Sequence, residues 1–269
     1  MLGASRGSMS HQVEVIEARR TAAGFDQLAQ ELFSIADLLG RERLLRHALA
    51  DSGQGEQARI ALAREVFATR VSALATDVVA EIVGERWSND ADLVSAIEEL
   101  GVQAAFAVAE SNGQLDATEE EIFLFSRAID ESSTLQMALT DPASSAEVKA
   151  SIVHDLLGGR VTAASEQVLA YTVGHLHGRR IDSVIEHLCE LAARQRDRVV
   201  AEVRVAQQLD ADQAARLADV LSRLKGRTVR LNIAVDPTVL GGVYVKVGDE
   251  VIDGTVAAKL EQARRVVLG

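Results

Sequence analysis

The spacing of apolar residues divides the chain into a long helical part and a short C-terminal part with a different period. From residue 11 to about residue 200, apolar residues recur three and four positions apart, as on the buried face of a helix. Two such stripes are Leu28, Leu32, Ile35 and Leu39, and Ile122, Phe125 and Ile129. Turn-forming residues interrupt the pattern at 51–55, 87–90, 110–116, 140–145 and 177–180. The pattern predicts short helices joined by short loops, as in a compact bundle.

After about residue 198, apolar residues alternate with polar ones, which is typical of half-buried strands. The alternation covers residues 199–206 and 228–236, and the stretch 209–226 between them predicts a helix with Asp210 as its N-cap. The side chains expected to face inward from these three elements are Val199, Ala201, Val203, Val205, Leu217, Leu221, Leu224, Val229, Leu231, Ile233 and Val235.

The stretch VDPTVLGGVYVKVGDEVIDGTVAAKL, residues 235–260, contains most turns of the C-terminal part. Its proline ends the preceding strand because it has no amide proton to donate to a sheet. The Gly-Gly pair predicts a kink or bulge before the strand VYVKV, Gly-Asp a two-residue hairpin loop to the strand EVID, and Asp-Gly-Thr the start of the last helix. These residues are Pro237, Gly241, Gly242, Gly248, Asp249, Asp253, Gly254 and Thr255. The C-terminal part is therefore predicted to be a small β-α-β-β-α domain.

An internal repeat extends over the helical part. Shifted by 90 positions, residues 45–94 align without a gap with residues 135–184, and the identical pairs include Arg70/Arg160, Asp51/Asp141 and Gly84/Gly174. A Leu-Phe-Ser triplet also recurs, with a slip of two positions. The alternative is a chance overlap of similar amphipathic helices. We predict an α+β fold that is mostly α: two tandem helical-bundle domains, residues 1–94 and 95–198, followed by the small domain 199–269.

Composition narrows the classes of function. The chain of 269 residues is 48% hydrophobic but only 3% aromatic, which favours helical bundles built from Ala, Leu, Val and Ile. Its net charge of −12 argues against a nucleic-acid partner, because phosphate contacts need an excess of Lys and Arg. No stretch has the length of an export signal or a membrane span, so no direct membrane insertion is expected. The single cysteine excludes an internal disulfide and fits a reducing compartment.

The residues that most resemble reactive or ligand-binding groups have structural explanations. Gly241 and Gly242 precede a strand, whereas phosphate-binding glycine loops lead into a helix. His175 and His177 would point to different faces of a helix; if Gly178 places them in a loop, they form at most a weak metal site. Cys189 falls at a core-like position. We therefore expect no catalytic residue, no cofactor and no metal site.

The acidic run at 116–121 has two interpretations, a cation site or the capped start of a helix. Asp116 and Glu119 have the spacing of a capping box, and carboxylates near a helix N-terminus stabilise the helix dipole. We prefer the capping interpretation.

Three stretches together are typical of one protein family. They are GVQAAFAVAESNGQLDATEEEI, HGRRIDSVIEHLCELA and VDPTVLGGVYVKVGDEVIDGTVAAKL, of which the last is the most specific. Through them, the region from about Gly101 to Gly269 resembles the delta subunit of the F-type ATP synthase, the bacterial relative of the oligomycin-sensitivity-conferring protein. Two features depart from the family pattern: Gly101 replaces a usual tyrosine, and residues 1 to about 94 are extra. Such an enlarged form is similar to the delta subunits of actinobacteria.

The resemblance implies a non-catalytic stator that ties the catalytic head to the peripheral stalk at the cytoplasmic face of the membrane. The helical domain would bind the N-terminal helix of an α subunit, and the C-terminal domain the C-terminal helices of a separate b subunit. For the α helix we single out Ala104, Ala105, Phe106 and Ala109, whose alternative role is ordinary bundle core; for the b subunit, Tyr244 and Lys246 on the hairpin. The extra copy is expected to add contacts to the head or the stalk.

Two other classes of function remain open from the residues alone. A generic helical adaptor with other partners would have the same periodicity. An enzyme would need a metal or a reactive thiol, for which His175, His177 and Cys189 are the candidates.

Overall fold

The computed structural model describes residues 4–196, 199–225, 229–236, 239, 241–247 and 250–256. The chain forms two compact units, Met1–Gln195 and Arg196–Gly269. The first is helical and the second contains a sheet, so the mostly α, α+β class predicted from the sequence is confirmed.

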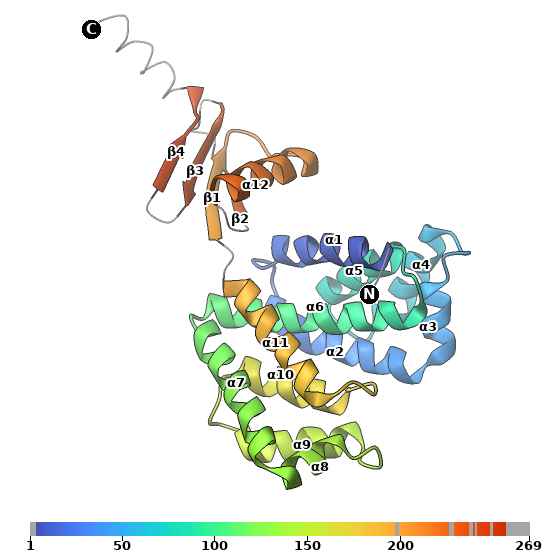
Figure 1. The fold of residues 1–269 in the computed structure, drawn as a ribbon. Helices are drawn as coiled ribbons and strands as arrows, with labels where there is room; N and C mark the ends of the chain where they lie inside the picture. Colours follow the sequence, from blue (N-terminus) through green and yellow to red (C-terminus); the bar gives the residue numbers. More distant parts are fainter. Residues whose placement is uncertain are drawn as a thin grey trace, which may run out of the picture. The chain divides into compact units, whose positions relative to one another are not determined.

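The helical unit contains eleven described helices (Figure 1). They are α1 (Ala4–Ala18), α2 (Phe25–Arg41), α3 (Arg43–Ala50), α4 (Glu56–Phe67), α5 (Ala73–Gly84), α6 (Asp90–Ser111), α7 (Leu115–Glu131), α8 (Ser133–Thr140), α9 (Ala146–Leu157), α10 (Ala163–Gly174) and α11 (Ile181–Arg196). The two predicted apolar stripes lie on α2 and α7, and all seven of their residues are buried. All five predicted interruptions contain the turns between helices, but the breaks near residues 20, 42, 70, 132 and 160 carried no signal that we recognised.

Side-chain caps explain several helix starts. Ser72, Asn89, Ser132, Ser145 and Thr162 each precede a helix and accept a hydrogen bond from a backbone N–H of its first turn. Each cap provides an acceptor for an amide that the helix itself leaves unbonded.

The predicted capping box in the acidic run is wrong. Helix α7 begins at Leu115, one residue before Asp116, and its N-cap Gln114 makes no side-chain cap hydrogen bond. Asp116 therefore lies inside the first turn, where its carboxylate still complements the positive end of the helix dipole.

The internal repeat is visible in the helix boundaries. Helices α2, α3, α4 and α5 correspond to α7, α8, α9 and α10, and every start and end differs by 90 residues. In this register Phe33 corresponds to Phe123, so the two-residue slip of the Leu-Phe-Ser triplets does not occur. The glycines Gly84 and Gly174 are also equivalent: each packs closely on the helix before it, with Ile60 and Ala146 beside the space that a Cβ would fill.

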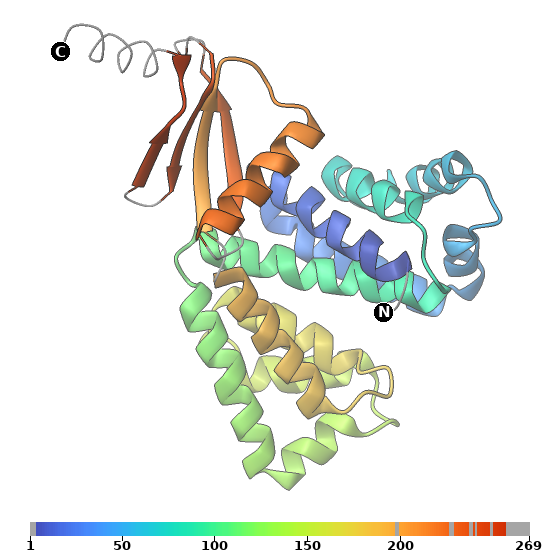
Figure 2. The ribbon, with the colours of Figure 1, turned by 45° about the horizontal axis from the view of Figure 1, so that its top comes forward.

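Helix α6 belongs to both halves of the helical unit. It packs against α1, α2, α3 and α5 of the first half and against α7 and α10 of the second (Figures 1 and 2). It also crosses residues 94 and 95 without interruption, and one apolar core extends from Met9 to Ala192. The division into domains 1–94 and 95–198 remains a prediction about folding.

The second unit is a four-stranded mixed sheet with a helix on one face. It contains β1 (Val199–Val205), α12 (Ala211–Lys225), β2 (Val229–Val235), β3 (Val243–Val247) and β4 (Glu250–Asp253), in the sheet order β2-β1-β3-β4. Strands β1 and β2 are parallel, and β3 is antiparallel to both β1 and β4. The predicted order β-α-β-β-α counted the hairpin as one β element, whereas its two arms are the separate strands β3 and β4. The predicted last helix lies outside the described residues except for its start at Val256.

The predicted alternation holds for most of this sheet. Ala201, Val203, Val205, Val245 and Val247 are buried with Leu221 of α12. Asp210 caps α12 as predicted: its carboxylate accepts a hydrogen bond from the Gln213 amide, and the Gln213 side chain bonds back to the Asp210 amide. The exceptions are Val235, 52% exposed, and Leu224, 68% exposed. Both lie at the ends of their elements, where fewer neighbours cover a side chain.

Candidate functional site

The most distinctive side-chain arrangement of the helical unit lies where its two halves meet. We call it the junction cluster, and it contains Phe33, Asp37, Glu98, Tyr171, His175 and His177. The rings of Phe33 and Tyr171 stack with centroids 4.1 Å apart, and the ring of His175 stacks on Tyr171 at 4.2 Å. Phe33 comes from α2 in the first half, and Tyr171 from α10 in the second. The stack therefore joins elements 138 residues apart in sequence.

Glu98 on α6 is the polar centre of the cluster. It is 8% exposed, and its Oε1 accepts hydrogen bonds from the Tyr171 hydroxyl at 3.1 Å and from His177 Nε2 at 2.7 Å. Arg179 lies 4.0 Å from the other carboxylate oxygen. A buried carboxylate needs such partners because desolvation otherwise penalises its charge. The burial of Tyr171 and the negative charge of Glu98 beside it raise the pKa of the tyrosine well above its usual range.

His175 bridges two acceptors. Its Nδ1 lies 2.8 Å from the carbonyl oxygen of Tyr171, and its Nε2 lies 3.3 Å from Oδ1 of Asp37. The ring of His175 thus links α2 to the end of α10.

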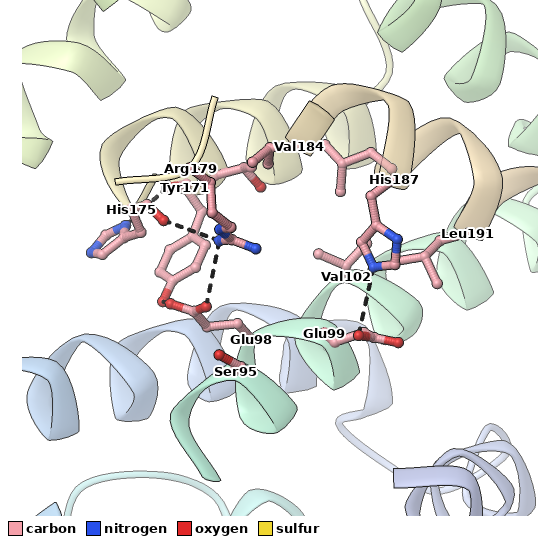
Figure 3. A pocket seen from close by; sticks show the side chains of 12 residues that line it. Ser95, Glu98, Glu99, Val102, Tyr171, His175, Arg179, Val184, His187 and Leu191 are labelled. Atoms are coloured by element: carbon pink, nitrogen blue, oxygen red, sulfur yellow. Dashed lines mark hydrogen bonds and ion pairs between the residues drawn. The ribbon is translucent and has the colours of Figure 1, made fainter. Parts of the chain in front are cut away.

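A small pocket adjoins the cluster between α6, α10 and α11 (Figure 3). Its volume is about 70 Å³, and its walls mix apolar groups such as Val102 and Leu191 with the carboxylates of Glu98 and Glu99. His187 of α11 faces Glu99, with Nε2 and Oε2 3.6 Å apart (Figure 3). Ligand and cofactor sites are typically several hundred Å³. The pocket therefore suits one side chain of a partner rather than a small-molecule ligand.

The pair His175 and His177 does not form a shared site. Helix α10 ends at Gly174, so both histidines lie in the turn, where His177 has a positive φ of 51°. Their rings are 6.0 Å apart and bond to different carboxylates. Among the described residues, no group of three or more His, Cys, Asp or Glu side chains is arranged to hold a metal ion.

Cys189 is half-buried on α11, packed against the apolar core. Burial and the nearby carboxylates of Glu119 and Glu186 raise the pKa of its thiol. The raised pKa favours the protonated thiol, which is a poor nucleophile.

The four residues predicted for the α-subunit helix lie inside the unit. Ala104, Ala105, Phe106 and Ala109 on α6 are all 3% exposed or less. In this chain their environment is the ordinary bundle core, the alternative role considered above. Ser95, Glu98 and Glu99 of the same helix line the pocket, and Glu98 is itself buried.

The predicted b-subunit residues lie on the sheet face opposite α12. Lys246 is exposed between the buried Val245 and Val247. Tyr244 pairs with Arg204 across β1 and β3, and the guanidinium carbon lies 5.7 Å above the tyrosine ring. The face thus combines an aromatic ring with two cationic groups.

The structure shows that the Gly-Gly motif has a backbone role. Gly241 and Gly242 have positive φ values of 102° and 84°, a conformation that favours glycine. A Cβ at Gly242 would lie 2.4 Å from the carbonyl oxygen of Gly254. Backbone hydrogen bonds from Gly254 to Val243 and from Val256 to Gly241 join the two halves of the motif. The predicted loop residues Gly248 and Asp249 lie outside the described residues, but Val247 pairs with Glu250 on either side of them.

Sequence reasoning missed the junction cluster. Two signals were available: Tyr171 is one of only two tyrosines in the chain, and it precedes the His-x-His turn by four residues. Glu98 also lies among positions of α6 that are buried and mostly apolar. Neither signal identifies Phe33 or Asp37 as the partners.

Comparisons with known proteins identify the family. The family described as ATP synthase delta (OSCP) subunit matches residues 102–267. The protein named ATP synthase subunit delta of Streptomyces avermitilis is 42% identical over 98% of this chain and 97% of its own length. The chain belongs to the ATP synthase delta (OSCP) subunit family. The family resemblance read from the sequence is thereby confirmed.

Other relatives are also similar to this chain over nearly its full length. Proteins of the same name from a Parafrankia species and from Streptomyces griseus are 41% and 38% identical, covering 98% and 100% of this chain and 99% and 100% of their own length. The family match begins at residue 102, so the first hundred residues are shared with these actinobacterial proteins beyond the family's common region. A chain of the Toxoplasma gondii mitochondrial ATP synthase hexamer is 18% identical over 62% of this chain and 95% of its own, with a TM-score of 0.28.

No helix within the described residues has the length and apolar composition needed to cross a lipid bilayer.

Proposed function

We propose that the chain is the non-catalytic delta subunit of the peripheral stalk, which holds the catalytic head still while the rotor turns. Its family membership, over nearly the whole length of the relatives, carries this proposal. The chain is held at the cytoplasmic face of the membrane by its partners. It bears load through contacts made by the helical unit and by the sheet unit.

For the helical unit, the partner is the N-terminal helix of an α subunit. The buried Ala104 and Phe106 cannot contact it unless the bundle opens, so we place the contact at the pocket between α6, α10 and α11, beside Glu99. An apolar side chain of the α helix would enter the pocket, and a basic one would face Glu99.

For the sheet unit, the partner is the C-terminal end of the b helices. Arg204, Tyr244 and Lys246 supply cationic and aromatic groups on a face that also carries Glu202 and Asp253 of the paired strands. We place the acidic side of an amphipathic helix against the cationic groups. This assignment keeps the division of labour that the resemblance implied.

Affinity purification of the intact complex tests the function itself. A tag on this chain should recover α, β and b subunits together, identified by mass spectrometry. Recovery of the tagged chain with unrelated proteins and without these subunits would favour the generic adaptor.

Charge reversal tests the α contact. Glu99→Lys should weaken binding of an α N-terminal peptide about tenfold, because a basic side chain of the peptide would then meet a like charge. The matched control is Glu131→Lys on α7, because Glu131 is 71% exposed and does not line the pocket. Calorimetry with both full-length variants measures the effect; equal affinities would remove the pocket from the α contact.

Lys246→Glu tests the b contact in the same way. It should weaken binding of a peptide from the b C-terminus, whereas Arg216→Glu on α12, which lies on the other side of the sheet, should not. Equal losses in the two variants would point to a general charge effect rather than to this face.

A further inference from the structure

The internal repeat reveals a helix face that is covered in the first half of the helical unit and open in the second. Helices α2 and α7 are equivalent, residue by residue, with an offset of 90. Both bury the same stripe against their own half. The residues of that shared stripe are Phe25, Leu28, Leu32, Ile35 and Leu39 on α2, and Leu115, Thr118, Ile122, Phe125 and Ile129 on α7.

Helix α2 buries a second stripe that α7 leaves open. Ala29, Phe33 and Ala36 are buried: α6 lies along α2, and Tyr171 of α10 also stacks on Phe33. The contact is close: a Cβ on Gly101 of α6 would lie 2.6 Å from the Phe33 ring, so the glycine makes room for it. The first half therefore shows that this face of the repeat accepts a helix with a small residue opposite the phenylalanine.

On the equivalent face of α7, no helix among the described residues covers the phenylalanine. Phe123 corresponds to Phe33 and is 55% exposed, and Leu124 beside it is 53% exposed. Among the described helices, α11 follows the second half as α6 follows the first, yet it does not pack along α7 as α6 packs along α2. We define the α7 face as Asp116, Glu119, Glu120, Phe123, Ser126, Arg127 and Asp130, which lie within one side of the helix around Phe123.

The charges of the α7 face select the kind of helix that fits. Four carboxylates surround Phe123 against one guanidinium, and Arg127 is itself paired with Glu131 at 3.4 Å. An acidic face with one exposed aromatic ring is poorly suited to an anionic membrane and complements a basic helix.

We propose that the α7 face is a docking site for a basic amphipathic helix of a partner protein, with a Gly or Ala against Phe123 and Lys or Arg on both sides. The partner helix would pack on α7 as α6 packs on α2, but it would come from another protein. It rests on the repeat and on charge, not on the stator role, and it lies on a different helix from the pocket assigned to the α subunit.

A peptide derived from α6 provides a defined probe. It has the sequence of residues 90–111 with the five acidic residues replaced by lysine, so it keeps Gly101 and gains positive charge. The full-length chain should bind it, as measured by fluorescence anisotropy, with an affinity that falls as salt is raised. The unmodified α6 peptide should bind at least tenfold more weakly.

Variants of the full-length chain locate the site. Phe123→Ser should weaken binding of the lysine peptide about tenfold, because the ring is the one large apolar anchor of the face. Leu44→Ser, at an 86% exposed leucine of α3, is the matched control and should leave the affinity unchanged. Circular dichroism of both variants checks that the helices are intact.

Three results would overturn the proposal. The first is equal affinity of the Phe123→Ser variant and the wild type for the lysine peptide. The second is equal binding of the acidic and the lysine peptide, which would remove the role of charge. The third is self-association of the chain that depends on Phe123 and excludes the peptide, which would make a second copy the occupant.

Discussion

At position 242 the backbone itself requires glycine. Gly241 and Gly242 both have positive φ, but only Gly242 meets backbone atoms where a Cβ would be. We expect Gly242→Ala to destabilise the sheet unit by about 2–3 kcal/mol and Gly241→Ala by about 1 kcal/mol. Hydrogen-exchange protection of the β1 and β3 amides measures both. Equal protection in the two variants would show that the contact between the added Cβ and Gly254 does not destabilise the sheet unit.

A surface ion pair makes the stability of the fold depend on pH. The Arg46 guanidinium donates to the Asp90 carboxylate at 2.9 Å, and this hydrogen bond lowers the pKa of Asp90. Because the folded pKa is depressed, the pair stabilises the fold above the ordinary aspartate pKa and loses this contribution as the pH falls through the folded pKa. Arg46→Gln should therefore reduce the melting temperature more at pH 7 than at pH 3.

Asp90→Asn is the companion variant for that pair. It removes the titrating group, so the difference between Asp90→Asn and the double variant with Arg46→Gln should be the same at both pH values. A difference that still grows between pH 3 and pH 7 would assign the effect to another carboxylate.

At the scale of elements, the two halves cap equivalent helices with the same device. Glu31 accepts hydrogen bonds from the amide and hydroxyl of Ser72 at the start of α5, and Glu121 accepts them from Thr162 at the start of α10. The two glutamates are 90 residues apart. Each connects one helix of the repeat to the N-terminus of another, where a negative charge is favoured.

Removing these carboxylates should have parallel effects. Glu121→Ala and Glu31→Ala are each expected to cost about 1–2 kcal/mol, because an amide and a hydroxyl lose a charged acceptor. The neighbouring Glu120→Ala and Gln30→Ala are matched controls at exposed positions. Urea unfolding followed by circular dichroism compares the four variants, and a control as destabilised as its partner would contradict the capping role.

Helices and their boundaries were predictable where the signal lies close together in the sequence. Apolar stripes three and four residues apart need only their own helix, so those of α2 and α7 were right in every residue. The breaks near residues 42 and 132 were missed because one residue between two helices leaves no cluster of turn-forming residues.

At the scale of the molecule, the main question is whether the two halves of the helical unit fold independently. The prediction of domains 1–94 and 95–198 treats them as separate, whereas α6 takes part in both. The first half also binds α6 through polar contacts. Ser5 donates a hydrogen bond to Asp92 at 2.7 Å, and Arg20 pairs with Glu110 at 2.6 Å.

Deletion of residues 1–89 tests this point. We expect the remaining chain to melt at a lower temperature and to bind a hydrophobic dye, because α6 loses the helices α1, α2, α3 and α5 that cover it. Calorimetry and dye fluorescence on the full chain and the deletion measure the effect. An unchanged melting temperature without dye binding would establish two independent helical domains.

The sequence by itself determined the features that depend on near neighbours along the chain. These are the helical and alternating periods, the cap at Asp210, the glycines of the Gly-Gly turn and the family motif that spans them. The tertiary structure decided which apolar faces are covered. It placed Phe106 in the core, left Phe123 exposed and brought Phe33 to Tyr171, because burial depends on which distant helix lies across a face. Periodicity identifies an apolar face, but only packing determines whether the chain itself covers it.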